Sequence, residues 1–471
     1  MSSHLRALTA AYRHAVDHLD GLESRPVAAT ASVGQLRERL GVPLPTTETP
    51  ADVVIDEMVA AASGGHLGSA SGRFFAWVIG GALPSALAAD WLASTWDNNA
   101  ALCACGPAAA VVEEVAGGWL KDILELPKEA SFAFTTGCQL AHMTCLAAAR
   151  HALLARAGWD VEADGLFGAP RIRVICSAQR HGSIERAVRF LGLGSNSLEP
   201  IVTEHDGRIS PARLEAALVC GKGPTIVVLN AADLNVGAFD PFVELIPIAK
   251  DAGAWVHVDG AFGLWARASP ERRHLAEGVE LADSWATDAH KWLNTPQDSG
   301  LAFVRDARAH KAAMTLSASY LASSDEARDE IDWTPDWTRR ARGFAVYAAL
   351  RELGRAGVAN LIERCCLHAT TLAHGISVLP NAQMLVPPTL NQGLVRFLDP
   401  NSSSEADHDH RTDATIQAIN DTGEAFFSGT TWNGRRAMRI SVCNWRTSAQ
   451  DIERTIEAFD SVLKSQKADR S

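Results

Sequence analysis

The chain has 471 residues, 47% hydrophobic and 21% charged, proportions typical of a globular protein that exclude disorder along the whole length. The formal net charge is −12 and no strongly basic block is present, which argues against nucleic acid as a partner. The longest apolar stretch, residues 74–89, contains Gly80, Gly81 and Pro84 and is shorter than the ~20 residues that span a bilayer. We expect buried segments around a Gly-Gly turn there, and no membrane partner.

The beginning of the chain is predicted to be a polar helical arm. Residues 1–65 are interrupted by Pro43, Pro45 and Pro50, and residues 1–20 lack the apolar core of a secretory signal. The cysteines number nine, an odd count, and follow neither disulfide-scaffold nor zinc-finger spacing. We therefore expect a reducing, cytoplasmic location.

From about residue 130, short β-rich runs alternate with helical stretches, which predicts an α/β fold with a mostly parallel sheet and helices on both faces. Apolar runs such as TIVVLN do not alternate, a pattern typical of strands buried on both sides. In such sheets ligands bind beyond the carboxyl ends of the strands. The predicted strands are 131–136, 171–177, 225–230, 255–259, 283–287 and 300–304, and the predicted helices are 139–158, 183–191 and 241–252.

The remainder of the chain is predicted to hold a mobile loop and a smaller domain. Residues 306–340 are charged and poor in pattern, and a long helix is predicted over 338–354. Beyond it we expect helices and strands, including a strand at 438–442, with an exposed loop at 402–411. His408 and His410 in that loop are candidate metal ligands, but we expect no metal site. The predicted division is an arm (1–65), a large domain (66–345) and a small C-terminal α+β domain (346–471).

Lys291, in DAHKW, is the most informative residue. Its apolar neighbours predict partial burial, which disfavours the ammonium form and lowers the pKa of a lysine. A neutral amine attacks carbonyl carbon and forms a Schiff base. Taken alone, the motif fits a surface lysine or a helix-capping lysine equally well.

Asp259 gives Lys291 a chemical context. It ends an apolar strand, where a buried carboxylate needs a partner. A protonated pyridine nitrogen is such a partner, as in enzymes that use pyridoxal phosphate. Ala261 is small enough for a flat ring to lie against the backbone. The 32 residues between Asp259 and Lys291 are enough for a helical crossover back into the same sheet.

Further polar residues follow other predicted strands. His181 comes after the strand at 171–177 and could stack on the second face of a cofactor ring, although a lone histidine is more often structural. Residues 136–139 join a strand to a helix, where main-chain N–H groups hold phosphate, and His290 adds a donor. No GxGxxG motif or P-loop is present, which argues against a nucleotide cofactor and a nucleotide-dependent α/β enzyme.

These residues lie in stretches that resemble the group II pyridoxal-phosphate-dependent amino-acid decarboxylases, the family of the aromatic-L-amino-acid, histidine and glutamate decarboxylases, and in particular a bacterial branch. The resemblance covers roughly residues 50–460 and includes HGSIERA, NVGAFDP, WVHVDGAFGLWA, ADSWATDAHKWLN and RRARGFAVYAALRELGRAGV. It implies fold type I of pyridoxal-phosphate enzymes, conversion of an L-amino acid, with an aromatic one as a candidate, to its amine, and a homodimer with the active site at the subunit interface.

The resemblance also implies a role for each matching residue. Lys291 resembles the Schiff-base lysine, Asp259 the partner of the pyridine nitrogen and His181 the histidine stacked on the ring. Ala261 matches the small residue on the opposite ring face, and Arg439 matches a basic position of the small domain near the substrate. The positions that match those around the phosphate are Gly137, Cys138 and His290.

The chain departs from the family pattern at several positions. Cys138 and Gln139 stand in the phosphate block, Asp233 precedes NVGAFDP, and Gln297 replaces a tyrosine. The family often protonates the carbanion with a loop tyrosine, but our alignment places Glu330 or Ile331 there, and the three tyrosines are Tyr12, Tyr320 and Tyr347. Another donor, such as His181 or water, could act instead. Loss of this tyrosine in relatives is associated with aldehyde synthesis, so an aldehyde synthase, another carbon–carbon lyase or a binding protein that retains the fold are the alternatives.

Overall fold

The computed structural model describes residues 2–316 and 327–468, which form two compact units. Unit 1 comprises Met1–Ile79, Thr371–Leu385 and Leu394–Ser471, and unit 2 comprises Gly80–Thr370 and Val386–Gly393. The arm therefore shares a unit with the C-terminal segment. The three-part division predicted from the sequence follows the order of the chain rather than compactness, and its boundaries stay a prediction.

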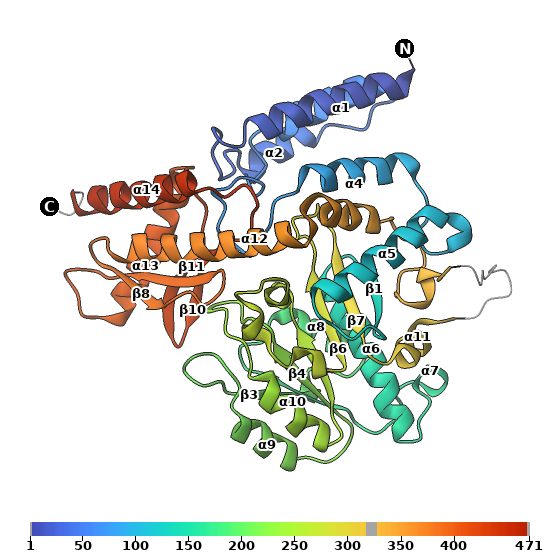
Figure 1. The fold of residues 1–471 in the computed structure, drawn as a ribbon. Helices are drawn as coiled ribbons and strands as arrows, with labels where there is room; N and C mark the ends of the chain where they lie inside the picture. Colours follow the sequence, from blue (N-terminus) through green and yellow to red (C-terminus); the bar gives the residue numbers. More distant parts are fainter. Residues whose placement is uncertain (1, 317–326, 469–471) are drawn as a thin grey trace. The chain divides into compact units, whose positions relative to one another are not determined.

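Unit 2 is built on a seven-stranded sheet with the strand order β1-β7-β6-β5-β4-β2-β3 (Figure 1). β7 runs antiparallel to β1 and β6, whereas the other neighbouring pairs are parallel, so the predicted mostly parallel sheet is confirmed. The sequence missed only the short β3. The strands are β1 (Ser131–Thr135), β2 (Arg173–Ser177), β3 (Leu198–Ile201), β4 (Thr225–Asn230), β5 (Trp255–Asp259), β6 (Ser284–Asp288) and β7 (Gly300–Val304).

Helices cover this sheet, and α6 packs across β1, β5, β6 and β7. Every residue of β1, β2, β4, β5, β6 and β7 is buried, which agrees with strands enclosed on both faces. The helices of unit 2 are α4 (Pro84–Trp96), α5 (Pro107–Ile123), α6 (Cys138–Arg156), α7 (Val161–Asp164), α8 (Gly182–Phe190), α9 (Pro211–Val219), α10 (Phe242–Asp251), α11 (Ala307–Met314) and most of α12 (Gly343–Ser377).

Three details of unit 2 differ from the sequence-based predictions. The connection from β5 to β6 is made by short 3₁₀ turns (263–268, 273–276 and 279–281) rather than an α-helix. The pattern-poor segment 306–340 begins with α11, because the Asp306 side chain caps it by accepting hydrogen bonds from the N–H groups of Arg308 and Ala309; residues 317–326 lie outside the described residues. The helix predicted over 338–354 is α12, which continues beyond a non-helical Gly354 with φ +58°.

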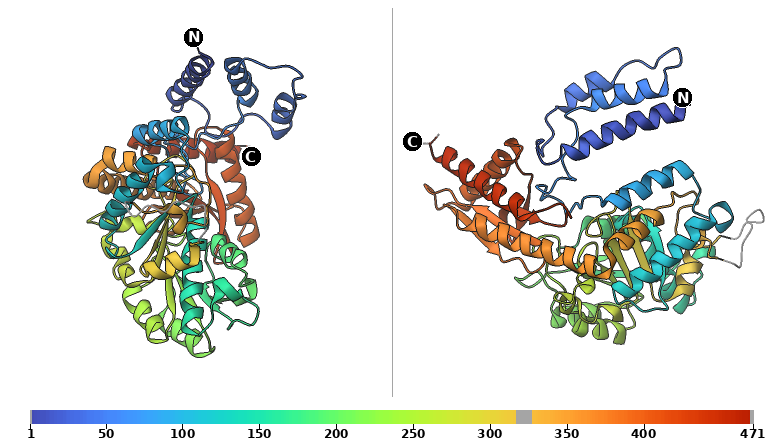
Figure 2. Two further views of the ribbon diagram at one scale, coloured as in Figure 1. Left: turned by 90° about the vertical axis from the view of Figure 1, so that its right-hand side faces the viewer. Right: turned by 45° about the horizontal axis from the view of Figure 1, so that its top comes forward.

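Unit 1 combines the arm with most of a four-stranded sheet in the order β10-β11-β9-β8. In the arm, α1 and α3 pack side by side (Figure 2). The elements are α1 (Ser3–Asp20), α2 (Val33–Leu40), α3 (Ala51–Ala62), β8 (Ala382–Val386), β9 (Gln392–Phe397), α13 (Glu405–Asp421), β10 (Ser428–Trp432), β11 (Arg435–Ser441) and α14 (Ala449–Ala468).

The loop predicted at 402–411 was wrong, because most of it is the first part of α13. Glu405 and Asp407 lie in the first turn of α13, where acidic side chains favour a helix N-terminus. His408 is used within this region, since its Nδ1 accepts a hydrogen bond from the N–H of Asp399 at 3.0 Å. Within residues 2–316 and 327–468, no group of three potential metal-ligating side chains occurs.

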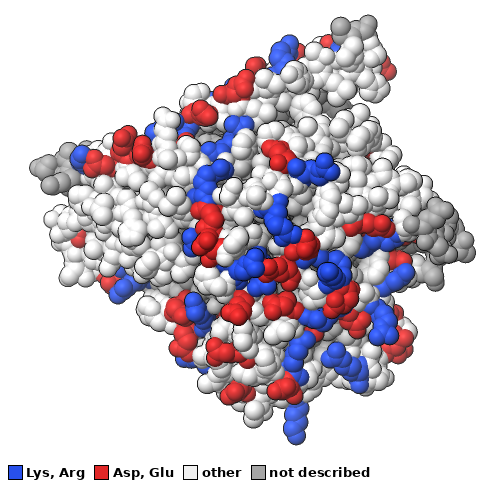
Figure 3. Space-filling view, viewed as in Figure 1, with Lys and Arg blue, Asp and Glu red and all other residues white. Residues whose placement is uncertain are grey.

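Two surface properties bear on partners. No helix among the described residues is both long and apolar enough to cross a bilayer. On the face shown in Figure 3, acidic and basic side chains are interspersed. A mixed surface of this kind differs from the basic stripe that typically binds a phosphate backbone.

Candidate active site

The predicted site residues Asp259 and Lys291 follow two neighbouring strands of unit 2. Asp259 ends β5, Asp288 ends β6, and the two strands run parallel with Asp259 opposite Ala286. Lys291 comes three residues after Asp288. The carboxyl ends of parallel strands share one edge of the sheet, so two carboxylates and an amine meet there, as the strand-end argument predicted.

Lys291 forms an ion pair with Asp288, its Nζ lying 3.2 Å from Oδ2. The Lys291 side chain is 20% exposed, and that of Asp288 is 4% exposed. Burial lowers the pKa of Lys291, but the Asp288 carboxylate raises it, and the pKa lies above its usual value. The sequence-based prediction that burial would lower this pKa was therefore wrong, because it did not include Asp288.

The main chain of the Lys291 turn lies against a glycine segment. A Cβ at Gly80 would overlap the Lys291 carbonyl oxygen, so only glycine fits this approach. The N–H of Gly81 donates to Asn294 Oδ1 at 2.8 Å. The Gly-Gly pair that the sequence suggested as a turn thus supports the lysine backbone, a role that its spacing did not reveal.

Asp288 also holds the beginning of α6. Its Oδ1 accepts a hydrogen bond from the Cys138 N–H at 2.6 Å and lies 3.8 Å from His290 Nε2. Burial raises the pKa of Asp288, but Lys291 and His290 lower it, and the result lies below the usual value. Sequence reasoning missed this residue, although it is the first residue of DAHKW.

The predicted phosphate region contains buried donors without partners. Gly137 precedes α6, and a Cβ at Gly300 would overlap the Gly137 backbone, so the two chains touch here. Gln139 Nε2 and the Ser299 hydroxyl are buried and have no hydrogen-bond partner in the described structure. Buried polar atoms are normally satisfied, so these donors fit an anionic group such as a phosphate.

His290 belongs to the same region. Its Nδ1 accepts a hydrogen bond from the Ser299 N–H at 3.2 Å, which directs Nε2 away from that bond. Burial lowers the pKa of His290, although Asp288 raises it, and the pKa stays below its usual value. A neutral ring accepting at Nδ1 carries its proton on Nε2, so His290 has one N–H to donate.

Asp259 is buried and keeps capacity for another hydrogen-bond donor. Its Oδ1 accepts from the Ala261 N–H at 3.2 Å, and its Oδ2 lies 3.6 Å from His142 Nε2. The Ala261 carbonyl in turn accepts from the Asp288 N–H at 2.9 Å, which ties the two strand ends together. This arrangement fits a carboxylate that receives a protonated ring nitrogen.

The remaining predicted residues lie in separate places. His181 caps α8, and its Nδ1 accepts from the Ser183 N–H at 3.2 Å. Asp233 closes a turn by accepting from the N–H groups of Asn235 and Val236. Arg439 lies in β11 of unit 1 and is buried, and its role toward substrate stays a prediction.

Glu330, at the position our alignment gives to the loop tyrosine, is buried 2.8 Å from the Arg328 guanidinium. Burial raises the pKa of Glu330 to about 8, although Arg328 lowers it. Tyr320 lies outside the described residues. Tyr347 stacks on Trp119 with ring centroids 5.0 Å apart, and Tyr12 is exposed on α1.

A mostly parallel sheet with an ion-paired lysine, a buried carboxylate and unpartnered donors at its carboxyl edge defines a pyridoxal-phosphate enzyme of fold type I. The sequence model of the pyridoxal-dependent decarboxylase conserved domain matches residues 34–398, so the chain belongs to this family. It is a pyridoxal-phosphate-dependent carboxy-lyase that acts on an amino acid, which confirms the predicted family, cofactor and class of reaction.

Individual relatives support this conclusion. Tryptophan decarboxylase 1 from Oryza sativa subsp. japonica is 29% identical, with 95% of this chain and 91% of that protein aligned. L-2,4-Diaminobutyrate decarboxylase from Rhizobium meliloti (strain 1021) is 31% identical, over 79% of this chain and 74% of that protein. The crystal structure of Oryza sativa TDC with PLP and tryptamine superposes with a TM-score of 0.91 and 27% identity, covering 98% of this chain and 97% of that one.

Proposed function

We propose that the enzyme decarboxylates an L-amino acid with an aromatic side chain to the corresponding amine, and that Lys291 carries the cofactor. The observation that supports this most directly is the buried Lys291–Asp288 pair beside Asp259, at the edge of the sheet where unpartnered donors collect. The aromatic substrate is supported by the tryptophan decarboxylase relative. A diaminobutyrate decarboxylase of similar identity makes a diamino acid the first competitor to test.

Each residue of the proposed site has a task. When bound, pyridoxal phosphate supplies the electron sink that accepts the electron pair left behind by departing carbon dioxide. Lys291 would hold the cofactor covalently, and Asp288 would keep the Lys291 amine in place. Asp259 would hold a proton on the pyridine nitrogen, and His181 and Ala261 would flank the ring.

The phosphate would be held mainly by the beginning of α6. Main-chain N–H groups at Gly137 and Gln139, the Ser299 hydroxyl and His290 Nε2 are the proposed donors. Because the Cys138 N–H is bound to Asp288, Cys138 is proposed to connect the phosphate region to the lysine rather than to bind the phosphate through its thiol.

The test is a product measurement with a panel of L-amino acids. Purified protein with added pyridoxal phosphate is incubated with tryptophan, tyrosine, phenylalanine, 2,4-diaminobutyrate and glutamate, and carbon dioxide and amine are quantified. We expect equal amounts of both from an aromatic substrate, and none from the Lys291→Ala variant. Turnover restricted to 2,4-diaminobutyrate or glutamate would overturn the aromatic assignment.

A second candidate function is aldehyde synthesis, favoured by Glu330 at the aligned tyrosine position. In this reaction the amino acid, dioxygen and water give the aldehyde, carbon dioxide, ammonia and hydrogen peroxide. The same incubations distinguish the two: peroxide and ammonia in amounts equal to carbon dioxide, with oxygen uptake, indicate the aldehyde route, whereas amine without oxygen uptake indicates simple decarboxylation.

A homodimer is proposed on the exposed apolar side chains of two elements. In unit 1, α1 exposes Leu5, Leu8 and Tyr12, and in unit 2, α4 exposes Trp91 and Trp96. Exposed apolar clusters of this kind mark association surfaces. Light scattering after size exclusion should give twice the chain mass, and Leu8→Asp should reduce it; a monomer at micromolar concentration would contradict the proposal.

The cytoplasmic location stays a proposal as well. All nine cysteines are free thiols, including those near the surface at Cys103, Cys105 and Cys220. Free thiols are stable in a reducing compartment.

A further inference from the structure

A column of buried polar side chains extends from Asp259 into the interior of unit 2. Trp255, His257 and Asp259 alternate along β5 and therefore point to one face of the sheet, the face that also carries Ser284, which lies opposite His257 on β6. His142 lies on α6, which packs across this face. The five side chains form an unbroken series between the sheet and α6.

The contacts along the column are short. Trp255 Nε1 donates to Ser284 Oγ at 2.9 Å, and Ser284 Oγ lies 2.9 Å from His257 Nδ1. His257 Nε2 lies 2.9 Å from His142 Nδ1, with the two rings perpendicular to each other. The series ends with His142 Nε2, 3.6 Å from Asp259 Oδ2.

Both histidines are neutral. They are fully buried, and burial lowers the pKa of His142 and lowers the pKa of His257 to about 3. The charged groups that act on His142 from surrounding elements are Asp259, Asp288 and Lys291, together with His181. A neutral imidazole has one donor nitrogen and one acceptor nitrogen, so the column has a direction.

The two ends of the column determine that direction. The Trp255 indole N–H only donates, so Ser284 Oγ accepts from it and directs its own hydrogen to His257 Nδ1. His257 then carries its proton on Nε2 and donates to His142 Nδ1, which leaves the His142 proton on Nε2, facing Asp259. The opposite order would direct an imidazole lone pair at a carboxylate, two acceptors facing each other in a buried site.

His142 Nε2 is buried and has no hydrogen-bond partner in the described structure, since 3.6 Å exceeds a hydrogen bond. A buried donor left unsatisfied is costly, and such groups occur where function requires them. We propose that His142, oriented by His257 and Ser284, is a positioning residue of the reaction. Its N–H fixes the orientation of the Asp259 carboxylate and so keeps that negative charge aligned with the ring nitrogen of the cofactor. This inference rests on the proposed role of Asp259.

The first test reads the direction of the column without cofactor. Cofactor-free protein labelled with ¹⁵N-histidine is measured by long-range ¹H–¹⁵N correlation NMR, with His142→Gln and His257→Gln used for assignment. We expect both His142 and His257 to carry the proton on Nε2 and to remain neutral down to pH 5. A proton on Nδ1 of His142, or a charged His142 ring, would overturn the proposal.

The second test compares substitutions in the holoenzyme. His142→Leu removes the donor, and His142→Gln keeps an N–H on a side chain of related length. His310 provides the matched control: it is fully buried, its pKa is lowered to about 3 by burial, and its ring contacts Ser131 Oγ at 2.8 Å and the Trp333 carbonyl at 2.9 Å. His310→Leu therefore removes an equivalent buried ring that does not contact Asp259.

Two readouts distinguish positioning from packing. For His142→Leu we expect the pH midpoint of the visible absorption band of bound cofactor to move by about one pH unit, and kcat/KM to fall by about 10- to 100-fold, the range for loss of an outer partner of a ligand. His142→Gln should recover part of both, and His310→Leu should change neither. Equal behaviour of His142→Leu and His310→Leu would overturn the proposal.

Two other outcomes are decided by the first test. If His142→Leu does not fold, the tautomers of the wild-type protein and the His142→Gln midpoint decide the proposal. If wild-type protein takes up no pyridoxal phosphate, the proposed function fails, whereas the tautomers still show whether the column donates toward Asp259.

Discussion

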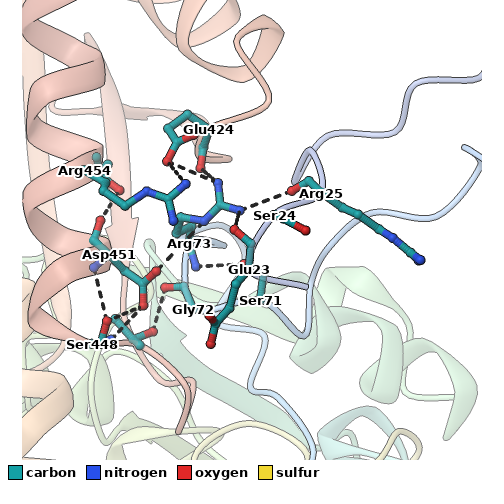
Figure 4. Close-up of polar contacts among 12 residues, drawn as sticks. Glu23, Ser24, Arg25, Ser71, Gly72, Arg73, Glu424, Ser448, Asp451 and Arg454 are labelled. Atoms are coloured by element: carbon teal, nitrogen blue, oxygen red, sulfur yellow. Dashed lines mark hydrogen bonds and ion pairs between the residues drawn. The ribbon is translucent and has the colours of Figure 1, made fainter. Parts of the chain in front are cut away.

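Two cations in the chain, Arg73 of unit 1 and Lys291 of unit 2, show how the same charge can be used in different ways. The Arg73 side chain is 2% exposed and donates to the main-chain carbonyls of Glu23, Arg25 and Glu424 (Figure 4). Its guanidinium also faces the Glu424 and Asp451 carboxylates, at 3.4 and 4.0 Å. Arg73 thus joins the arm to two C-terminal segments of its unit.

Lys291 has a different environment. It is less buried than Arg73 and makes one ion pair, with Asp288, while nearby donors such as Gln139 Nε2 and the Ser299 hydroxyl lack partners. Arginine presents a rigid fork that several acceptors can occupy, whereas lysine carries a point charge on a flexible stem that can become a nucleophile. The comparison suggests that a cation surrounded by acceptors stabilises the fold, and that one held by a single carboxylate among unsatisfied groups is available for chemistry.

The largest effect should follow Lys291→Ala. We expect the rate of carbon dioxide release to fall on the order of 10⁴-fold, because the nucleophile and its covalent link are lost. The free energy of unfolding should change by about 1 kcal/mol, since Asp288 keeps the Cys138 N–H. Activity assays and urea unfolding measure the two quantities. A large loss of stability with partial retention of activity would reverse the roles assigned to the two cations.

The next largest effect should follow Arg73→Met. Removing the guanidinium leaves carbonyls and carboxylates unpaired in a buried position, so we expect the free energy of unfolding to fall by about 3–5 kcal/mol. Cofactor uptake per folded molecule should be unchanged. Arg73→Lys is the control: it keeps the charge without the fork and should recover only part of the stability. A wild-type unfolding curve for Arg73→Met would contradict the structural role.

A smaller, pH-dependent effect is expected from His310, a buried neutral group. Burial lowers the pKa of His310 to about 3 from an ordinary value of 6.5. As the pH falls, the unfolded chain takes up the proton first, so this stability contribution is complete above pH 6.5 and is lost on going to pH 3. Between pH 6.5 and 5 the loss is about 2 kcal/mol. His310→Leu should reduce the fall in unfolding free energy between pH 7 and 5 by that amount; an unchanged slope would show that His310 is charged in the native state.

The sequence predicted the catalytic sheet well because buried parallel strands have a strong local signal. The strands at 225–230, 255–259 and 300–304 were placed at their observed bounds. Local pattern failed where a long-range or capping effect decides the outcome. Residues 402–411 look like a polar loop, yet α13 forms because acidic first-turn residues favour it and its buried face packs within unit 1.

The site was predictable to the extent that motifs carried it. The DAHKW motif identified Lys291, and the end of an apolar strand identified Asp259. The sign of the Lys291 pKa shift was not predictable, because it depends on a 3.2 Å distance to Asp288. His142 and His257 are 115 residues apart and share no motif, so only the register of α6 on the sheet brings them together.

The smallest effect is expected at Cys138, and it tests whether its side chain or its main chain matters. Burial raises the pKa of the Cys138 thiol well above its usual value, and the Asp288 carboxylate raises it further, so the thiol is unreactive at neutral pH. The N–H bond to Asp288 at 2.6 Å does not depend on the side chain. Cys138→Ala should therefore change cofactor affinity by less than about threefold, the equivalent of under 1 kcal/mol. Thiol titration of the native protein should spare Cys138 and modify the exposed Cys105 and Cys220, which serve as internal controls. A tenfold loss of cofactor affinity in Cys138→Ala would show that the thiol itself contacts the phosphate. In that case the departure from the family pattern at this position would be a functional substitution rather than a neutral one.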